Sequence, residues 1–193
     1  AGPTINSVIA LSPDALDQAR AMDAELKAGK YRGPLHGVPI LLKDNIEAAG
    51  ALPTTAGSLA LKDNITNRDA PLVARLREAG AVIIGKTNLS EWANIRSDSS
   101  TSGWSAVGGL TRNPYAIDRN SCGSSSGSGA AMPHKGLVER GYPKNKIYQT
   151  HGAASLDLIR VGGKDVEGSF VSSGPAVVAD LLPDSNPSKA LGM

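Results

Sequence analysis

The chain has 193 residues, of which 40% are hydrophobic, and its 20 Lys and Arg against 18 Asp and Glu leave a net charge of +2. This length allows one domain or two small ones, and no stretch gathers enough basic residues to follow a nucleic-acid backbone, so we expect no nucleic-acid partner. No apolar run approaches the roughly 20 residues that span a bilayer, so we expect a soluble chain without a membrane partner. The single cysteine, Cys122, excludes an intrachain disulfide and leaves the compartment open, a secreted or periplasmic origin included.

The first half of the chain alternates between helix and strand patterns. Residues 12–14, Ser-Pro-Asp, are typical of a helix start, and apolar residues recur at helical spacing until Gly29. An apolar strand is predicted over 38–42, a second helix over 69–79 and a β-branched strand over 81–84. This order favours an α/β fold with a mixed or mainly parallel sheet covered by helices.

The pattern weakens in the second half. A short helix is predicted over 89–93, and residues 97–129 are polar and loop-rich. At about Ala131 the composition changes, and short apolar or helix-like segments follow at 137–140, 147, 156–161, 170–171 and 176–182. We therefore divide the chain into residues 1–131 and 132–193.

Residues 80–87 match the phosphate-binding pattern G-x-x-x-x-G-K-T, but their arrangement argues against a nucleotide site. A phosphate loop lies between a strand and a following helix, because the helix N-terminus supplies the amide donors. Here the four middle residues are predicted to be the strand itself, and the helix comes first. The sequence indicates a strand and a turn.

Residues 123–127 match G-x-S-x-G, the turn that presents a nucleophilic serine after a strand. The preceding residues, 118–121, do not have a strand pattern. His134 and His151 have no acid partner that the sequence identifies, so we do not predict a Ser-His-Asp hydrolase. Nor do we assign catalysis to Cys122, since a lone cysteine is most often a small apolar filler.

Four segments occur in an order that points to one enzyme family. They are Gly33-Pro34-Leu35-His36-Gly37-Val38-Pro39, Leu42-Lys43-Asp44-Asn45, Gly85-Lys86-Thr87-Asn88-Leu89-Ser90-Glu91-Trp92 and Cys122-Gly123-Ser124-Ser125-Ser126-Gly127. Together they resemble the amidase signature family, with the closest likeness to bacterial peptide amidases, over about residues 14–131. The resemblance implies an α/β fold that is incomplete here relative to the full amidase fold.

The resemblance also implies a site of one lysine and two serines. In that family a nucleophilic serine loses its proton, through a second serine held by a cis peptide bond, to a neutral lysine. Motif by motif, Lys43 takes the role of the terminal base and Ser124 that of the bridging serine. Such a lysine must be uncharged, and burial away from water lowers a lysine pKa from about 10.4. The implied substrate is a small amide or peptide, with no cofactor and no metal.

The nucleophile that should complete this site is missing from the sequence. The family's nucleophilic serine lies in a T-D-x-x-G-S-type segment some way beyond the bridging serine, and residues 141–155 contain no such segment. Ser155 follows small residues but lacks the preceding acid and the glycines. We therefore expect an amidase-type hydrolase in truncated or fused form that is inactive as it stands.

The tail, about residues 133–187, resembles a piece of a periplasmic binding protein for branched-chain amino acids. The segments that carry this likeness are Gly141-Tyr142, Ile147-Tyr148-Gln149-Thr150-His151-Gly152-Ala153, Arg160-Val161-Gly162-Gly163-Lys164 and Leu182-Pro183-Asp184-Ser185-Asn186-Pro187. The piece lacks the two-lobed cleft that binds ligand in that family, so we assign no ligand-contacting residue. The simplest account is a join near residues 131–133.

Two other functions stay open. The chain could be a non-catalytic folding or interaction unit in which the Ser/Gly loop is only a loop, or its tail could bind a solute such as leucine, isoleucine or valine. The front part also lacks the rest of the family's sheet. We therefore expect its exposed apolar edges to be covered by the tail or by a second copy of the chain in a homo-oligomer.

Overall fold

The computed structural model describes residues 4–131, together with 141, 143, 148–149 and 170–171. The chain divides into two compact units, Ala1–Ala131 and Met132–Met193. In the second unit, β8 (Tyr148–Gln149) pairs in parallel with β9 (Phe170–Val171). The other predicted tail segments and the residues His134, His151 and Ser155 lie outside the described residues. Within the described ranges, no helix is long and apolar enough to cross a membrane.

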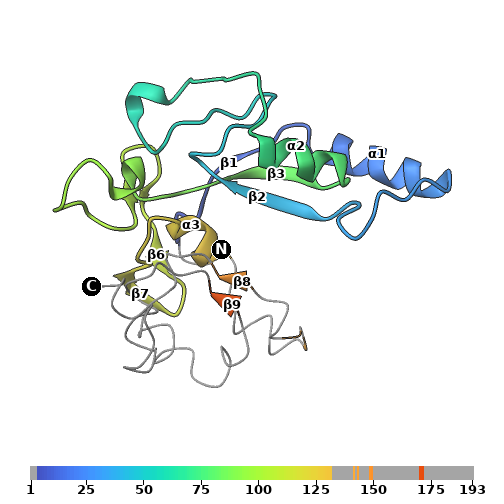
Figure 1. Ribbon diagram of the computed structural model, residues 1–193. Helices are drawn as coiled ribbons and strands as arrows, with labels where there is room; N and C mark the ends of the chain where they lie inside the picture. The colour runs from blue at the N-terminus through green and yellow to red at the C-terminus, as the bar shows by residue number, and fades with distance from the viewer. Residues whose placement is uncertain (1–3, 132–140, 142, 144–147, 150–169, 172–193) are drawn as a thin grey trace, which may run out of the picture. The chain divides into compact units, whose positions relative to one another are not determined.

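The first unit is built on a three-stranded mixed sheet (Figure 1). Its strands are β1 (Val8–Leu11), β2 (Pro39–Lys43) and β3 (Val82–Thr87), in the order β1-β3-β2. The central strand β3 runs parallel to β2 and antiparallel to β1. The prediction of a mixed α/β sheet is confirmed, and the prediction of strands near 38–42 and 81–84 is correct to within a few residues.

One face of this sheet carries the apolar core. Ile40 and Leu42 of β2 are register partners of Ile83 and Lys86 of β3, so these four side chains share a face. The buried core residues are Leu42, Ala48, Leu52, Val73 and Ile83. Val73 comes from α2 (Pro71–Glu78), which begins at a proline as the sequence predicts. Helix α2 therefore covers the face on which Lys86 lies.

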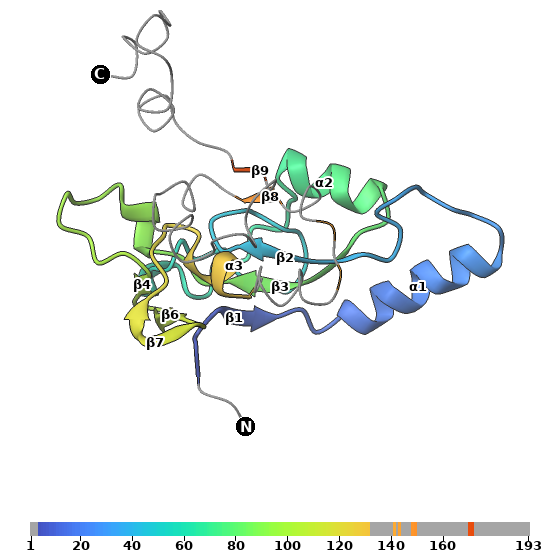
Figure 2. The same cartoon turned by 90° about the horizontal axis from the view of Figure 1, so that it is seen from below.

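The other face carries Lys43 and its register partner Thr87, and α3 (Ser126–Ala131) packs across it. Figures 1 and 2 show α2 and α3 on opposite sides of the strands. Helix α1 (Ala15–Lys27) contacts β3, where Gln18 Oε1 accepts a hydrogen bond from the Ile83 amide at 3.3 Å. The sheet thus separates an apolar face from a face rich in hydroxyl groups.

Several sequence-based boundaries differ from the structure. Helix α1 has Asp14 at its N-cap rather than Ser12, whose carbonyl accepts the Ala15 amide. The helix predicted over 89–93 is only a 3-10 turn, Glu91–Asn94, in which Trp92 and Ala93 have positive φ. A regular α-helix cannot form there because those dihedrals lie in the left-handed region.

The segment 97–129, predicted to be loop, contains short strands and the start of a helix. These elements are β4 (Trp104–Ser105), β5 (Gly109–Leu110), β6 (Arg112–Asn113), β7 (Ala116–Asn120) and α3. Outside this segment, a 3-10 turn, Leu59–Leu61, precedes α2. Strand β7 corrects the view that no strand precedes residues 123–127. It was missed because its side chains are mostly exposed and polar and show no apolar alternation.

Candidate active site

Lys43 and Ser124, the two residues that the family resemblance singled out, meet in the structure. Lys43 is the last residue of β2, and Ser124 lies just before α3, 81 positions further along the chain. The Lys43 Nζ atom donates a hydrogen bond to Ser124 Oγ at 2.8 Å. The amine is therefore within proton-transfer distance of the hydroxyl.

The surroundings of Lys43 favour an uncharged amine. Its side chain is only partly exposed, and this burial lowers the pKa of the amine below its ordinary value of 10.5. On the same face, the Thr87 hydroxyl forms a hydrogen bond with the Ser128 hydroxyl at 2.8 Å. The segment that carries Ser124 is thus attached to the ends of both parallel strands.

The loop before Ser124 has an unusual backbone. The peptide bond between Gly123 and Ser124 is cis, and Cys122 has a φ of +62°. Ser90 connects this loop to a second segment. Its amide donates a hydrogen bond to the Ser124 carbonyl at 3.0 Å, and its hydroxyl accepts one from the Gly103 amide at 2.8 Å. A β-carbon at Gly123 would lie 2.3 Å from Ser90 Oγ, so any larger residue would displace the Ser90 hydroxyl.

Replacing Ser90 by alanine should lower the free energy of unfolding by about 1–3 kcal/mol, because the buried Gly103 amide would lose its acceptor. Urea unfolding followed by circular dichroism measures this change. Ser99→Ala, at an exposed position in the neighbouring loop, is the matched control and should leave stability within about 0.5 kcal/mol. Equal midpoints for the two variants would contradict the role given to Ser90.

Asn88 is a buried centre of hydrogen bonding that the sequence did not identify. Its Nδ2 donates to the Gly109 carbonyl and to Thr111 Oγ1, each at 3.0 Å. Its Oδ1 accepts from the Ser105 hydroxyl at 2.6 Å, and its carbonyl accepts from the Gly127 amide at 2.9 Å. Asn88 therefore joins the end of β3 to the 105–111 segment and to α3.

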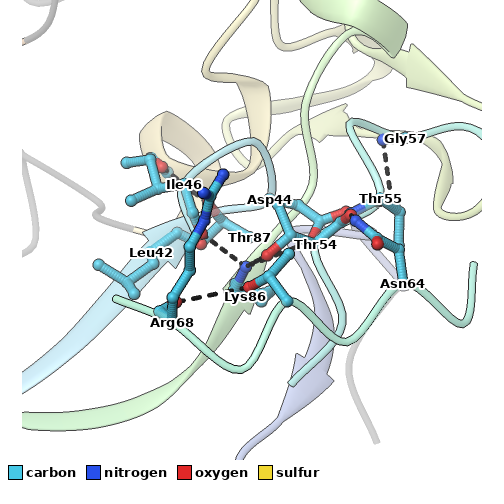
Figure 3. A network of polar contacts seen from close by, with 12 residues as sticks. Leu42, Asp44, Ile46, Thr54, Thr55, Gly57, Asn64, Arg68, Lys86 and Thr87 are labelled. Atoms are coloured by element: carbon cyan, nitrogen blue, oxygen red, sulfur yellow. Dashed lines mark hydrogen bonds and ion pairs between the residues drawn. The ribbon is translucent and has the colours of Figure 1, made fainter. Parts of the chain in front are cut away.

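A buried ion pair lies on the apolar face of the sheet (Figure 3). Lys86 Nζ is 3.7 Å from Asp44 Oδ1, and these side chains are 0% and 1% exposed. The Lys86 amine also donates to the Ile46 carbonyl at 2.7 Å and to Thr54 Oγ1 at 2.9 Å. In the sequence, Lys86 belongs to the phosphate-loop pattern and to the third family segment but was given no role, and its position inside strand β3 explains why the phosphate-loop pattern forms no loop.

In the described part of the chain, the single histidine bonds residues other than Lys43 and Ser124. His36, the only described histidine, bonds the Met22 carbonyl and accepts from the Arg32 amide, far along the chain from Ser124. Within the described part of the chain, no group of three His, Cys, Asp or Glu residues could hold a metal ion. Cys122 is a free, exposed thiol.

Comparisons with known proteins agree with the fold and the motifs. The family model described as Amidase matches residues 1–138. The crystal structure of native peptide amidase from Stenotrophomonas maltophilia is similar, with 58% sequence identity and a TM-score of 0.67 over 71% of this chain and 28% of that one. A relative from Arabidopsis thaliana with an amidase name is 52% identical over 132 residues, 67% of this chain and 26% of that protein.

The similarity extends to an enzyme with a different name. The structure of 6-aminohexanoate cyclic dimer hydrolase has 37% sequence identity and a TM-score of 0.52 over 66% of this chain and 24% of that one. The chain thus spans about a quarter of the length of the relatives it matches. Its α/β unit corresponds to a part of the amidase fold. Because the family model covers residues 1–138 of 193, the chain belongs to the amidase family.

Proposed function

We propose that the first unit carries the proton-relay part of an amidase-type hydrolase that acts on a carboxamide or a peptide amide. In this proposal Lys43 is the terminal base and Ser124 is the bridging serine. The observation that carries it is the 2.8 Å hydrogen bond between Lys43 Nζ and Ser124 Oγ, formed by residues 81 positions apart.

The relay consists of two linked proton transfers. The Ser124 hydroxyl takes the proton of an attacking hydroxyl while it gives its own proton to the neutral Lys43 amine, so the positive charge ends on the lysine. A lysine with a lowered pKa suits this role, because a larger fraction of it is uncharged near neutral pH. The partial burial of Lys43 supports the assignment for this reason.

We further propose that the chain is inactive as it stands, because residues 141–155 contain no T-D-x-x-G-S-type segment to supply the attacking hydroxyl. The purified chain should hydrolyse a C-terminal peptide amide and a small carboxamide no faster than its Lys43→Ala variant does. Release of ammonia, measured by a coupled assay, tests this. Robust hydrolysis that Lys43→Ala abolishes would contradict the proposed inactivity while supporting the role of Lys43.

A chimera tests the relay itself. Residues 1–131 would replace the matching segment of the Stenotrophomonas maltophilia peptide amidase, which is 58% identical to this chain. We expect an active amidase, and we expect Lys43→Met or Ser124→Ala in the chimera to lower kcat about 10²–10⁴-fold. Ser99→Ala, at an exposed position, is the control and should leave kcat unchanged. A folded, active chimera that tolerates Lys43→Met would refute the proposal.

The tail and the assembly of the chain remain separate proposals. Peptide mapping across Ala130–Lys135, with an intact mass near 19.8 kDa, would establish the join. Calorimetric titration with leucine, isoleucine and valine would reveal solute binding by the tail, and the absence of heat would exclude it.

Strands β1 and β2 are the edges of the sheet, and unpaired strand edges can bind a second copy of the chain. Light scattering over a range of concentrations therefore tests the homo-oligomer that we expect.

A further inference from the structure

The two lysines at the ends of the parallel strands point to opposite faces of the sheet. Lys43 is the register partner of Thr87, whereas Lys86 is the register partner of Leu42. Lys43 therefore faces Ser124 and α3, and Lys86 faces the apolar core. The two lysines lie on neighbouring strands, but Lys43 bonds a serine hydroxyl whereas Lys86 pairs with a carboxylate.

Asp44 follows Lys43 directly but is held on the face of Lys86. Its amide continues the β2–β3 ladder by donating to the Thr87 carbonyl at 3.1 Å, and its carbonyl accepts the Ala56 amide at 3.1 Å. Its Oδ2 accepts hydrogen bonds from the amide and the hydroxyl of Thr55, and its Oδ1 lies near Lys86 Nζ. Figure 3 shows the carboxylate enclosed between the amine of Lys86 and the 54–55 segment.

We propose that the Asp44–Lys86 ion pair is a positioning device for the Lys43–Ser124 relay, an inference that rests on the proposed function. The ion pair with Lys86 holds the Asp44 carboxylate on the face of the sheet that is opposite to the Lys43 amine. The Lys43 amine then faces a serine hydroxyl instead of a counter-ion. None of the ion pairs in the described part of the chain includes Lys43.

The charges around the pair are consistent with this role. Burial raises the pKa of Asp44 and lowers that of Lys86, while the attraction between them opposes both shifts. Glu47 also acts on Lys86, but its carboxylate is paired with Arg68 at 2.7 Å. The pKa of Lys43 is lowered by burial, with no carboxylate acting in the opposite direction. Asp44 and Lys86 therefore balance each other's charge close to Lys43.

The test measures the pKa of Lys43 in the full chain by NMR of ¹³C-labelled lysine, with the signal assigned by a Lys43→Arg variant. Lys86→Met removes a nearby cation and leaves Asp44 unpaired, so the pKa of Lys43 should rise. Asp44→Asn removes the anion and should not raise it. The double variant Asp44→Asn/Lys86→Met should return the Lys43 pKa to the wild-type value.

The direction of these shifts separates positioning from a general structural role. A pair that only holds the fold together would, when broken from either side, let water reach Lys43 and raise its pKa in both single variants. That result, or an unchanged pKa in Lys86→Met, overturns the inference. If Lys86→Met does not fold, Asp44→Asn and the double variant decide. A Lys43 pKa lower in Asp44→Asn than in the double variant supports the inference, because only Asp44→Asn leaves the Lys86 cation unbalanced; equal values, or failure of both variants to fold, overturn it. A wild-type Lys43 with an ordinary pKa would instead refute the proposed function.

Discussion

Replacing Gly127 by alanine is expected to lower the free energy of unfolding of the first unit by about 3 kcal/mol. Gly127 is buried in α3, and a β-carbon there would lie 2.2 Å from the Ser7 carbonyl oxygen and 2.4 Å from the Asn88 amide nitrogen. These two atoms form a hydrogen bond of 2.9 Å with each other. The added methyl group would therefore have to separate backbone from backbone, which no rotation of a side chain can relieve.

Gly129 provides a matched control in the same helix. It is exposed, and a β-carbon at this position would meet nothing within 4 Å. Gly129→Ala should leave stability unchanged or raise it by up to about 1 kcal/mol, because alanine is the better helix former. Urea unfolding compares the variants. A Gly127→Ala midpoint as high as that of Gly129→Ala would show that α3 does not pack on the sheet as described.

The regular elements of the first unit could be predicted because their local patterns agree with their tertiary environment. Pro71 at the start of α2 and the β-branched residues of β3 are signals that depend only on neighbouring positions. Strand β1 gave no such signal, since it has four residues and none of them is buried. It forms because it pairs with β3, and the sequence of one short segment does not show which strand it will pair with.

The site was predictable only in part. The contact between Lys43 and Ser124 could be predicted because the family resemblance pairs two residues 81 positions apart, which no local pattern does. Asn88 was missed because a polar residue after a strand is usually part of a loop, whereas its side-chain partners in the 105–111 segment lie 17 to 23 positions away. Lys86 was missed because lysines are rarely buried, and its counter-ion is 42 positions earlier in the chain.

The ion pair on the apolar face should also control stability. Lys86→Met is expected to destabilise the first unit by about 3–5 kcal/mol at neutral pH, because it leaves a buried carboxylate without its partner. Burial already raises the pKa of Asp44 above its ordinary value of 3.8, and the loss of Lys86 removes an opposing attraction. The folded variant should therefore bind a proton at Asp44 more tightly than the unfolded chain does.

This linkage fixes the sign of the pH dependence. A carboxyl group whose folded pKa lies above its unfolded value adds stability below about pH 4, and that stability is lost as the pH rises through the folded pKa. Lys86→Met should thus regain stability as the pH falls from 7 toward 4, and Asp44→Asn/Lys86→Met should lack that gain. Urea unfolding at several pH values measures both slopes. If the single and double variants run parallel, the folded pKa of Asp44 does not lie above its unfolded value, and an unpaired buried carboxylate is not the cause of the lost stability.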